Sequence, residues 1–175
     1  MKRIALVTSL SAAALVGCSQ DADIGADLAI PTAPRSCSAA DLGTSGVQGE
    51  IIDPMTGETF VFGTPTVTVH HTDEQTPDMV ALTDNAFSLQ LNLLCAGTQV
   101  GDYAVRDQVD QHAPNCPFEA SADIGGHSIE YLAGTAGRIV IDDMSNTQSA
   151  DCLAGRFAID FGGNGTLTGW FIGPR

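Results

Sequence analysis

Positive charge is scarce in this sequence. Its 175 residues include only seven lysines and arginines against 21 aspartates and glutamates, which gives a formal net charge of −14. Proteins that bind nucleic acids use lysine and arginine to neutralise phosphates, so this balance excludes a nucleic-acid partner. The same balance repels anionic lipid surfaces. A strongly acidic composition is typical of a well-hydrated, soluble surface.

The common catalytic motifs are also missing. The sequence contains no Gly-x-Ser-x-Gly elbow, no His-Glu-x-x-His pair, no phosphate-binding P-loop and no Gly-x-Gly-x-x-Gly turn after a strand. A cysteine nucleophile needs a free thiolate, which disulfide-bonded cysteines do not supply. These absences remove the usual grounds for proposing an enzyme, and we favour a protein without catalytic activity.

Long apolar runs are absent apart from one near the N-terminus. Lys2 and Arg3 precede residues 4–16, which carry no charge, and Gly17 is a small residue at the end of the run. As a helix this run is about 20 Å long, too short for a bilayer core of about 30 Å. The pattern predicts a signal peptide over residues 1–17 that is removed. Its removal leaves five arginines and no lysine against 21 acidic residues, a net charge of −16.

The segment ends in Leu15-Val16-Gly17-Cys18. These four residues closely resemble the lipobox of bacterial lipoprotein precursors. The resemblance implies that a diacylglycerol is attached to the sulfur of Cys18, that cleavage occurs before Cys18, and that the new N-terminus is acylated. Two or three acyl chains hold a protein stably at a membrane. Because Ser19 stands where an aspartate would imply retention in the inner membrane, the resemblance also implies the outer membrane. An ordinary cleaved signal is the alternative.

The residues that follow are typical of a linker. Residues 18–36 are rich in Asp, Ala and Pro and have no sustained apolar period. Fully extended, they would reach about 60 Å. Residues 37–175 are enough for one domain. We therefore predict a signal peptide (1–17), a lipidated N-terminus with a flexible tether (18–36) and a single domain (37–175).

Four cysteines follow Cys18 in the sequence: Cys37, Cys95, Cys116 and Cys152. An even number of cysteines in an exported protein indicates disulfides, here two. Three connectivities are possible, and we favour Cys95 with Cys116 and Cys37 with Cys152. Zinc binding is the rival interpretation, but the sequence has no Cys-x-x-Cys pair.

Apolar and polar residues alternate with a period of two through much of the domain. The clearest example is residues 87–93, where Phe and Leu alternate with Ser, Gln and Asn. Further strands are predicted at residues 48–52, 59–62, 66–70, 103–106, 118–122, 128–132, 139–141, 156–161 and 166–171. Turn-forming residues separate these runs, notably at 53–57 and 162–165.

About ten short strands, each with one apolar face, predict an all-β fold. The most suitable arrangement is an antiparallel two-sheet β-sandwich of jelly-roll or immunoglobulin-like type, and a small β-barrel is the alternative. Runs such as Gly-Arg-Ile-Val-Ile at 137–141 and Leu-Thr-Gly-Trp-Phe at 167–171 give a pattern similar to that of uncharacterised bacterial lipoproteins of β-sandwich type. That resemblance implies the fold and no activity.

Two pairs of residues are candidate metal ligands. His70 and His71 are adjacent, but neighbouring residues of a strand point to opposite faces, so we favour a polar strand end that leads into a loop. Asp142 and Asp143 begin an oxygen-rich stretch that could form a calcium loop. Surface turns favour the same residues for backbone hydrogen bonding, and we prefer that interpretation. Calcium is the one cofactor that the sequence suggests.

Trp170 is the only tryptophan. Alternation places it on the strand face opposite to Leu167 and Phe171. An exposed ring would offer a stacking platform for a sugar or an anchor for a partner protein. We favour a ring that is covered by a neighbouring loop or by the second sheet.

Together these features predict a lipid-anchored, disulfide-bonded protein of the bacterial outer membrane, facing the periplasm or the cell surface. We expect a non-enzymatic binding or structural module of the cell envelope. Its partners would be the membrane, through Cys18, and a protein or glycan. One alternative is a carbohydrate- or calcium-binding module, which needs Trp170 exposed or the Asp142 region folded around an ion. The other is a hydrolase of unfamiliar type, which needs carboxylates that converge in a cleft.

Overall fold

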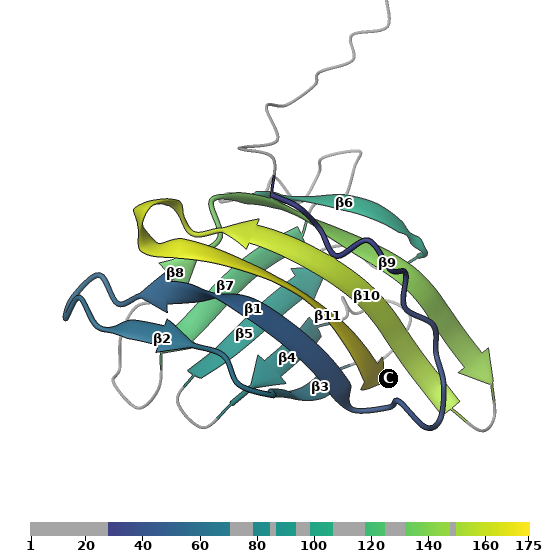
Figure 1. The fold of residues 1–175 in the computed structure, drawn as a ribbon. Helices are drawn as coiled ribbons and strands as arrows, with labels where there is room; N and C mark the ends of the chain where they lie inside the picture. Colours follow the sequence, from purple (N-terminus) through teal and green to yellow (C-terminus); the bar gives the residue numbers. More distant parts are fainter. Residues whose placement is uncertain are drawn as a thin grey trace, which may run out of the picture.

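The computed structural model describes residues 28–70, 79–84, 87–93, 99–106, 118–124, 132–147 and 150–175. These residues are nearly all β-structure, which confirms the predicted class (Figure 1). The elements are β1 (Thr44–Ile52), β2 (Thr59–Val61), β3 (Thr66–His70), β4 (Met79–Thr83), β5 (Phe87–Leu93), β6 (Gly101–Arg106), β7 (Phe118–Ile124), β8 (Leu132–Ala133), β9 (Ala136–Thr147), β10 (Ala150–Asp160), a short 3-10 turn η1 (Gly162–Asn164) and β11 (Gly165–Pro174).

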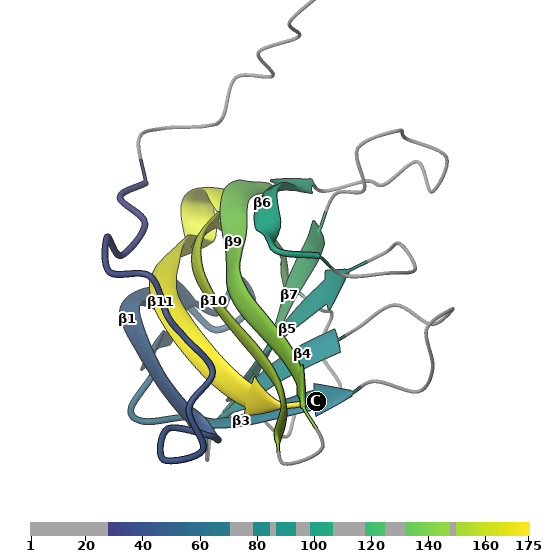
Figure 2. The same ribbon diagram turned by 90° about the vertical axis from the view of Figure 1, so that its right-hand side faces the viewer.

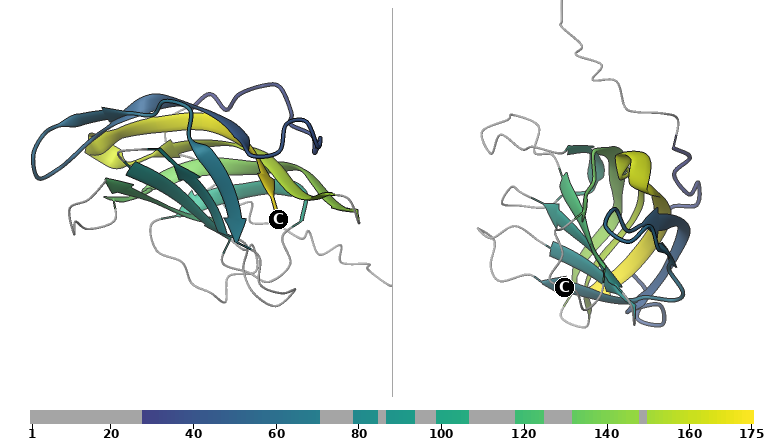
Figure 3. Two further views of the ribbon diagram at one scale, coloured as in Figure 1. Left: turned by 90° about the horizontal axis from the view of Figure 1, so that it is seen from below. Right: turned by 90° about the vertical axis from the view of Figure 1, so that its left-hand side faces the viewer.

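The strands form two antiparallel sheets along one hydrogen-bonded path. The first sheet has the order β2-β1-β11-β10-β9-β6, and the second has the order β7-β5-β4-β3, with β8 paired to β7. A single parallel pair, Val105 with Phe118, connects the two sheets between β6 and β7. The second sheet lies behind the first in Figure 1, and the two layers are seen from below in Figure 3.

The small β-barrel considered as an alternative is wrong. The path of described strands ends at β2 and β3, which do not pair with each other, so the sheets do not close. Instead, β3 crosses the inner face of β11. A Cβ atom added at Gly173 would lie 2.4 Å from Val69 Cγ2 and 2.8 Å from Val67 Cγ1, so these valine side chains of β3 pack directly against the backbone of β11. This contact brings the edge of the second sheet under the first (Figure 2).

Both sheets contribute to one apolar core. Leu89 and Leu91 of β5 and Ile139 and Ile141 of β9 are fully buried, as their alternation predicts. The other large side chains in this cluster include Ile51, Leu82, Leu153, Phe157, Ile159, Phe161, Leu167 and Phe171. Removing this much apolar surface from water is the main force that holds the two layers together.

Most predicted strands are present, and two features differ. Strand β4 was not predicted, although Val80 and Leu82 alternate as inward residues, because Met79 and Ala81 on its other face are also apolar and the segment shows no polar alternation. Strand β9 runs on to Thr147 through residues expected to form a turn, because residues 143–147 pair with the start of β10. Of the segment predicted at 128–132, residues 128–131 lie outside the described residues, as do Cys18 and the segment predicted to be a signal peptide.

The predicted turn after β1 is built around Asp53, which is only 3% exposed. Its Oδ1 accepts a hydrogen bond from the Met55 N–H at 2.7 Å, and its Oδ2 accepts one from the Thr56 hydroxyl at 2.9 Å. Gly57 has a φ of +73°, which favours glycine. The side-chain bonds fix the hairpin without a long loop. Across the described ranges, no helix has the length and apolar character needed to cross a bilayer.

Candidate functional site

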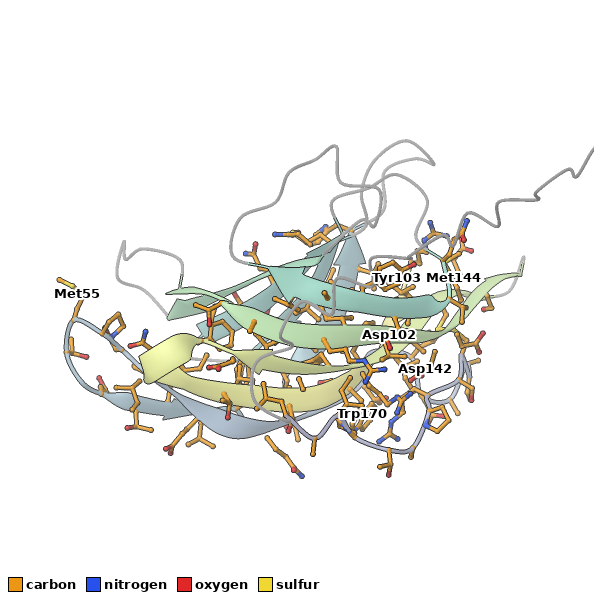
Figure 4. The ribbon with its side chains drawn as sticks, turned by 90° about the horizontal axis from the view of Figure 1, so that it is seen from above. Met55, Asp102, Tyr103, Asp142, Met144 and Trp170 are labelled. Carbon is orange, nitrogen blue, oxygen red and sulfur yellow. A yellow bond between two sulfur atoms is a disulfide. The ribbon has the colours of Figure 1, made fainter. Side chains whose placement is uncertain are left out.

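The most elaborate arrangement of polar side chains lies on the outer face of β9, β10 and β11, which points away from the core. Residues 31–37, here called the strap, run along this face before the chain enters β1 (Figures 1 and 4). All of the strap except Cys37 belongs to the segment that the sequence analysis assigns to a tether. Its contacts therefore show how the chain leaves the folded domain.

A β-bulge in β9 prepares this face for the strap. The pairing register between β9 and β10 shifts so that Asp143 lies opposite Ala154 while Ile141 lies opposite Gly155. Asp142 is therefore an extra residue in its strand. Ile141 is buried in the core and Met144 packs against it, so the two aspartates between them both face outward. A regular strand would have turned one of them inward.

The two outward aspartates accept hydrogen bonds from the strap backbone. The Arg35 N–H donates to Asp142 Oδ2 at 3.0 Å, and the Cys37 N–H donates to Asp143 Oδ2 at 2.8 Å. Two residues that are two apart in an extended chain direct their N–H groups to the same side. The bulge thus gives consecutive carboxylates a spacing that matches alternate amides of the strap.

Arg156 of β10 links the sheet to the start of the strap. Its Nε and Nη2 donate to Asp142 Oδ2 and Oδ1, each at 2.7 Å, and its Nη1 donates to the carbonyl oxygen of Pro31. The side chains of Arg156 and Asp142 are only 13% and 4% exposed. A bidentate pair with so little water around it fixes both groups in one geometry.

A second ion pair, between Arg138 and Asp102, is much more exposed than the pair of Arg156 and Asp142. Arg138 of β9 donates from Nε to both carboxylate oxygens of Asp102, at 2.7 and 2.8 Å. This hydrogen bonding raises the pKa of Arg138 above its ordinary value. Both side chains are about half exposed, however, so water screens their attraction. Among the described residues, these hydrogen bonds join only the two side chains and hold no backbone segment, so we assign the pair no role in the site.

Trp170 of β11 lies on the same outer face, and its ring is covered. The guanidinium carbon of Arg35 lies 3.9 Å from the ring centroid, a cation–π contact. The indole also lies over Gly46 of β1, where an added Cβ atom would be 2.5 Å from Trp170 Nε1. This arrangement agrees with the covered ring favoured from the sequence. With Arg35 over its face, Trp170 is not an open platform for a sugar.

A disulfide between Cys37 and Cys152 closes the C-terminal end of the strap. This is the pairing that the sequence analysis favoured. Around it, Leu42, Ala154 and Ile172 form a small apolar cluster that is separate from the main core. Cys95 and Cys116 lie outside the described residues.

The described candidate metal ligands lie on two different strands, His70 on β3 and the aspartate pair on β9. His70 is exposed at the end of β3, and His71 lies outside the described residues. Asp142 and Asp143 lie in a strand and not in the expected turn, and their oxygens accept bonds from Arg156 and the strap. In the part of the chain that is described, no three His, Cys, Asp or Glu residues are grouped to hold a metal ion.

Compared with protein-family models, with curated proteins and with solved structures, the chain matches none of them. The outer face must therefore be interpreted from its own contacts. It combines carboxylate acceptors for amides, a guanidinium donor for a carbonyl and an aromatic surface for an arginine. These groups bind an extended peptide segment, and in this chain that segment is the strap.

The sequence analysis did not identify Arg35 or Arg156 as site residues. One signal was available. Only five arginines follow residue 17, and on a strongly acidic protein each of them is expected to lie beside a carboxylate. The bulge at Asp142 left no such signal. An aspartate pair is equally common in turns, and nothing local shows that the strand continues.

Proposed function

We propose that this chain is a lipid-anchored outer-membrane lipoprotein, attached through Cys18, and that its domain is a non-enzymatic binding or structural module of the cell envelope. The lipobox-like residues 15–18 carry the anchor part of the proposal. The strap supports it, because it ties the segment next to the anchor firmly to the domain. Such an attachment is useful where the N-terminal segment transmits force to the domain or fixes its orientation.

The spacing between anchor and strap suits a short tether. Twelve residues, 19–30, separate Cys18 from the strap. Fully extended, twelve residues reach about 40 Å, close to the thickness of a small domain. The domain would therefore stay near the membrane surface while its net charge of −16 keeps it from lying on anionic lipids. The acyl chains would supply the whole attachment.

We further propose that the two sheets form an antiparallel β-sandwich. The shared core and the absence of β2–β3 pairing support this arrangement. The jelly-roll and immunoglobulin-like types both need Greek-key connections. Here β3-β4-β5 and β9-β10-β11 each lie side by side in chain order, which favours a meander over either of those types.

Binding or structural work is the better-supported class of activity. The polar groups that converge on the outer face are already engaged with the strap, and they include no free base beside a nucleophile. The carbohydrate- and calcium-binding alternatives have less support, because Arg35 covers Trp170 and Arg156 occupies Asp142. Of the two expected partners, a protein of the envelope is therefore better supported than a glycan.

The decisive test of the anchor is the mass and partitioning of the purified protein. The parent chain is expected to start at Cys18, to carry the mass of two or three acyl chains and to enter the detergent phase. A Cys18→Ser variant should stay unlipidated and enter the aqueous phase, whereas Ser19→Ala, as a matched control, should behave as the parent. Identical processing and partitioning of Cys18→Ser and the parent would refute the proposal.

The outer-membrane location has its own test. A Ser19→Asp variant is expected to move to the inner-membrane fraction with its lipid intact, because an aspartate after the lipidated cysteine favours retention there in bacteria of the enteric pattern. Ser19→Asn supplies a control of nearly the same size without the charge. If the parent itself fractionates with the inner membrane, the location is wrong even though the anchor stands.

A further inference from the structure

The strap is attached to the sheet by one covalent bond, between Cys37 and Cys152, and otherwise only by non-covalent contacts. We propose that this disulfide is a thiol-sensitive latch. When it is oxidised, the strap lies over the outer face of β9–β11. When a dithiol reduces it, the strap leaves the sheet, uncovers Trp170 and becomes part of a longer tether.

The two cysteine residues differ in exposure. Cys37 is half-buried and belongs to the strap, whereas Cys152 is fully buried in β10. A thiolate of an incoming dithiol can therefore approach Cys37 Sγ. Its attack forms a mixed disulfide with Cys37 and breaks the Cys37–Cys152 bond, and Cys152 leaves as a thiolate that takes up a proton. The second thiol of the dithiol then displaces Cys37, so that the reductant becomes a disulfide and both cysteines become thiols.

The remaining contacts are too few to hold the strap once the bond is broken. Within the described part of the chain, three hydrogen bonds join the seven strap residues to the sheet, donated by Arg35 N–H, Cys37 N–H and Arg156 Nη1. Ordering one residue takes about as much free energy as one net hydrogen bond returns. The cation–π contact of Arg35 and the packing of Cys37 against Ala154 and Ile172 each add one interaction of similar size, which still leaves fewer interactions than ordered residues. The balance therefore favours release.

Release of the strap also leaves the buried ion pair of the sheet intact. Asp142 and Arg156 keep both of their mutual hydrogen bonds without the strap, since these bonds lie between β9 and β10. The docked strap, in contrast, contains an unsatisfied donor. Arg35 Nε is buried and has no hydrogen-bond partner among the described residues. Water would satisfy this group after release, which removes a penalty of the docked state.

Release should stop at the turn that precedes β1. The Gly43 N–H donates to the carbonyl oxygen of Ile172 at 2.8 Å, and the Asp41 N–H donates to that of Ser38 at 3.0 Å. These backbone bonds do not involve the strap. Freeing residues 31–37 would add about 25 Å of extended chain to the tether. This gain in reach rests on the proposed lipid anchor, whereas the latch itself does not.

The single tryptophan makes the latch directly measurable. The mature protein is reduced with dithiothreitol under native conditions, and free thiols at Cys37 and Cys152 are verified by peptide mapping. We expect Trp170 emission to shift to longer wavelength and its acrylamide quenching constant to rise at least about twofold, because water replaces Arg35 at the ring. Far-ultraviolet circular dichroism should keep its β-sheet signal.

Two cysteine variants separate this bond from the others. Cys37→Ser/Cys152→Ser should show the reduced-state emission without any reductant. Cys95→Ser/Cys116→Ser should show the oxidised-state emission and still respond to dithiothreitol.

Unchanged Trp170 emission and quenching with both thiols free would overturn the proposal. Loss of the β-sheet signal on reduction of the parent would overturn it too, because the bond would then be a structural staple. Neither readout depends on acylation at Cys18, so failure of the latch and failure of the anchor are distinguishable.

Discussion

Asp142 and Arg156 meet on the outer face of the sheet through two hydrogen bonds of 2.7 Å, and the strap is built onto that pair. Asp142 Oδ2 also accepts from the Arg35 N–H, while Arg156 donates to the Pro31 carbonyl. One ion pair within the sheet thus presents both an acceptor and a donor to the passing chain. The pair positions the strap because its own geometry is already fixed.

Removing the carboxylate of this pair should be strongly destabilising. Asp142→Ala leaves the largely buried Arg156 cation without its partner, and we expect the free energy of unfolding to fall by about 3–5 kcal/mol. Urea unfolding of the oxidised protein measures the change. Asp143→Ala is the matched control, because it removes only the acceptor for the Cys37 N–H and should lower stability by about 1 kcal/mol.

The same experiment has a third arm that tests the cause. Arg156→Leu added to Asp142→Ala removes the unpaired charge, so the double variant should be more stable than Asp142→Ala alone. Equal losses for Asp142→Ala and Asp143→Ala would show that the ion pair contributes no more than a single hydrogen bond. A double variant less stable than Asp142→Ala alone would show that the packing of the Arg156 side chain matters more than its unpaired charge.

Deletion of Asp142 tests the bulge. The shortened strand regains regular alternation, with Ile141 and Met144 still directed inward and a single aspartate between them. We expect a folded domain whose strap is more accessible to protease. Deletion of Val140, by contrast, removes a residue from a regular stretch and turns its neighbours to the wrong face, so this variant should not fold. Circular dichroism and limited proteolysis distinguish the two outcomes, and similar behaviour of both deletions would contradict the bulge assignment.

The strands were predictable because their physics is local. A strand with one face on the core alternates apolar and polar residues, and this pattern is visible in residues 87–93 or 166–171 without any knowledge of the partner strand. The Cys37–Cys152 bond belongs to one of the three possible connectivities of the four cysteines. We favoured that connectivity because a disulfide was expected to hold the N-terminal edge of the domain. The covered state of Trp170 followed from the usual fate of a large ring.

The strap and the bulge were not predictable for the opposite reason. The strap contacts join residues 107, 106 and 125 positions apart, and no periodicity in the strap itself reflects them. Its composition, with two prolines among seven residues, is typical of a linker whether or not the linker packs on a surface. The bulge depends on the register of β10 against β9, which the sequence of β9 alone does not contain.

Arg35 should report the covering of Trp170 without any change in the disulfide. In Arg35→Ala the guanidinium is lost from the ring face, so we expect a longer emission wavelength and stronger acrylamide quenching, with about 1 kcal/mol lower stability. Arg35→Lys keeps a cation and should fall between the two. Arg138→Ala removes an arginine from the same sheet but away from the ring, and should leave the emission unchanged. An emission shift of equal size in Arg138→Ala would mean that net charge, and not contact, sets the signal.

Gly46 tests how closely β1 and Trp170 are packed beneath the strap. A methyl group at this position would lie 2.5 Å from Trp170 Nε1, so Gly46→Ala must displace the indole or the strand. We expect a loss of about 1–3 kcal/mol in the free energy of unfolding and an altered Trp170 emission, because overpacking forces neighbours from their preferred positions. Gly163→Ala is the control, since nothing lies within 4 Å of its added Cβ atom. If both variants have the same urea midpoint as the parent, the indole moves aside without cost. The surface beneath the strap is then deformable and not rigidly packed.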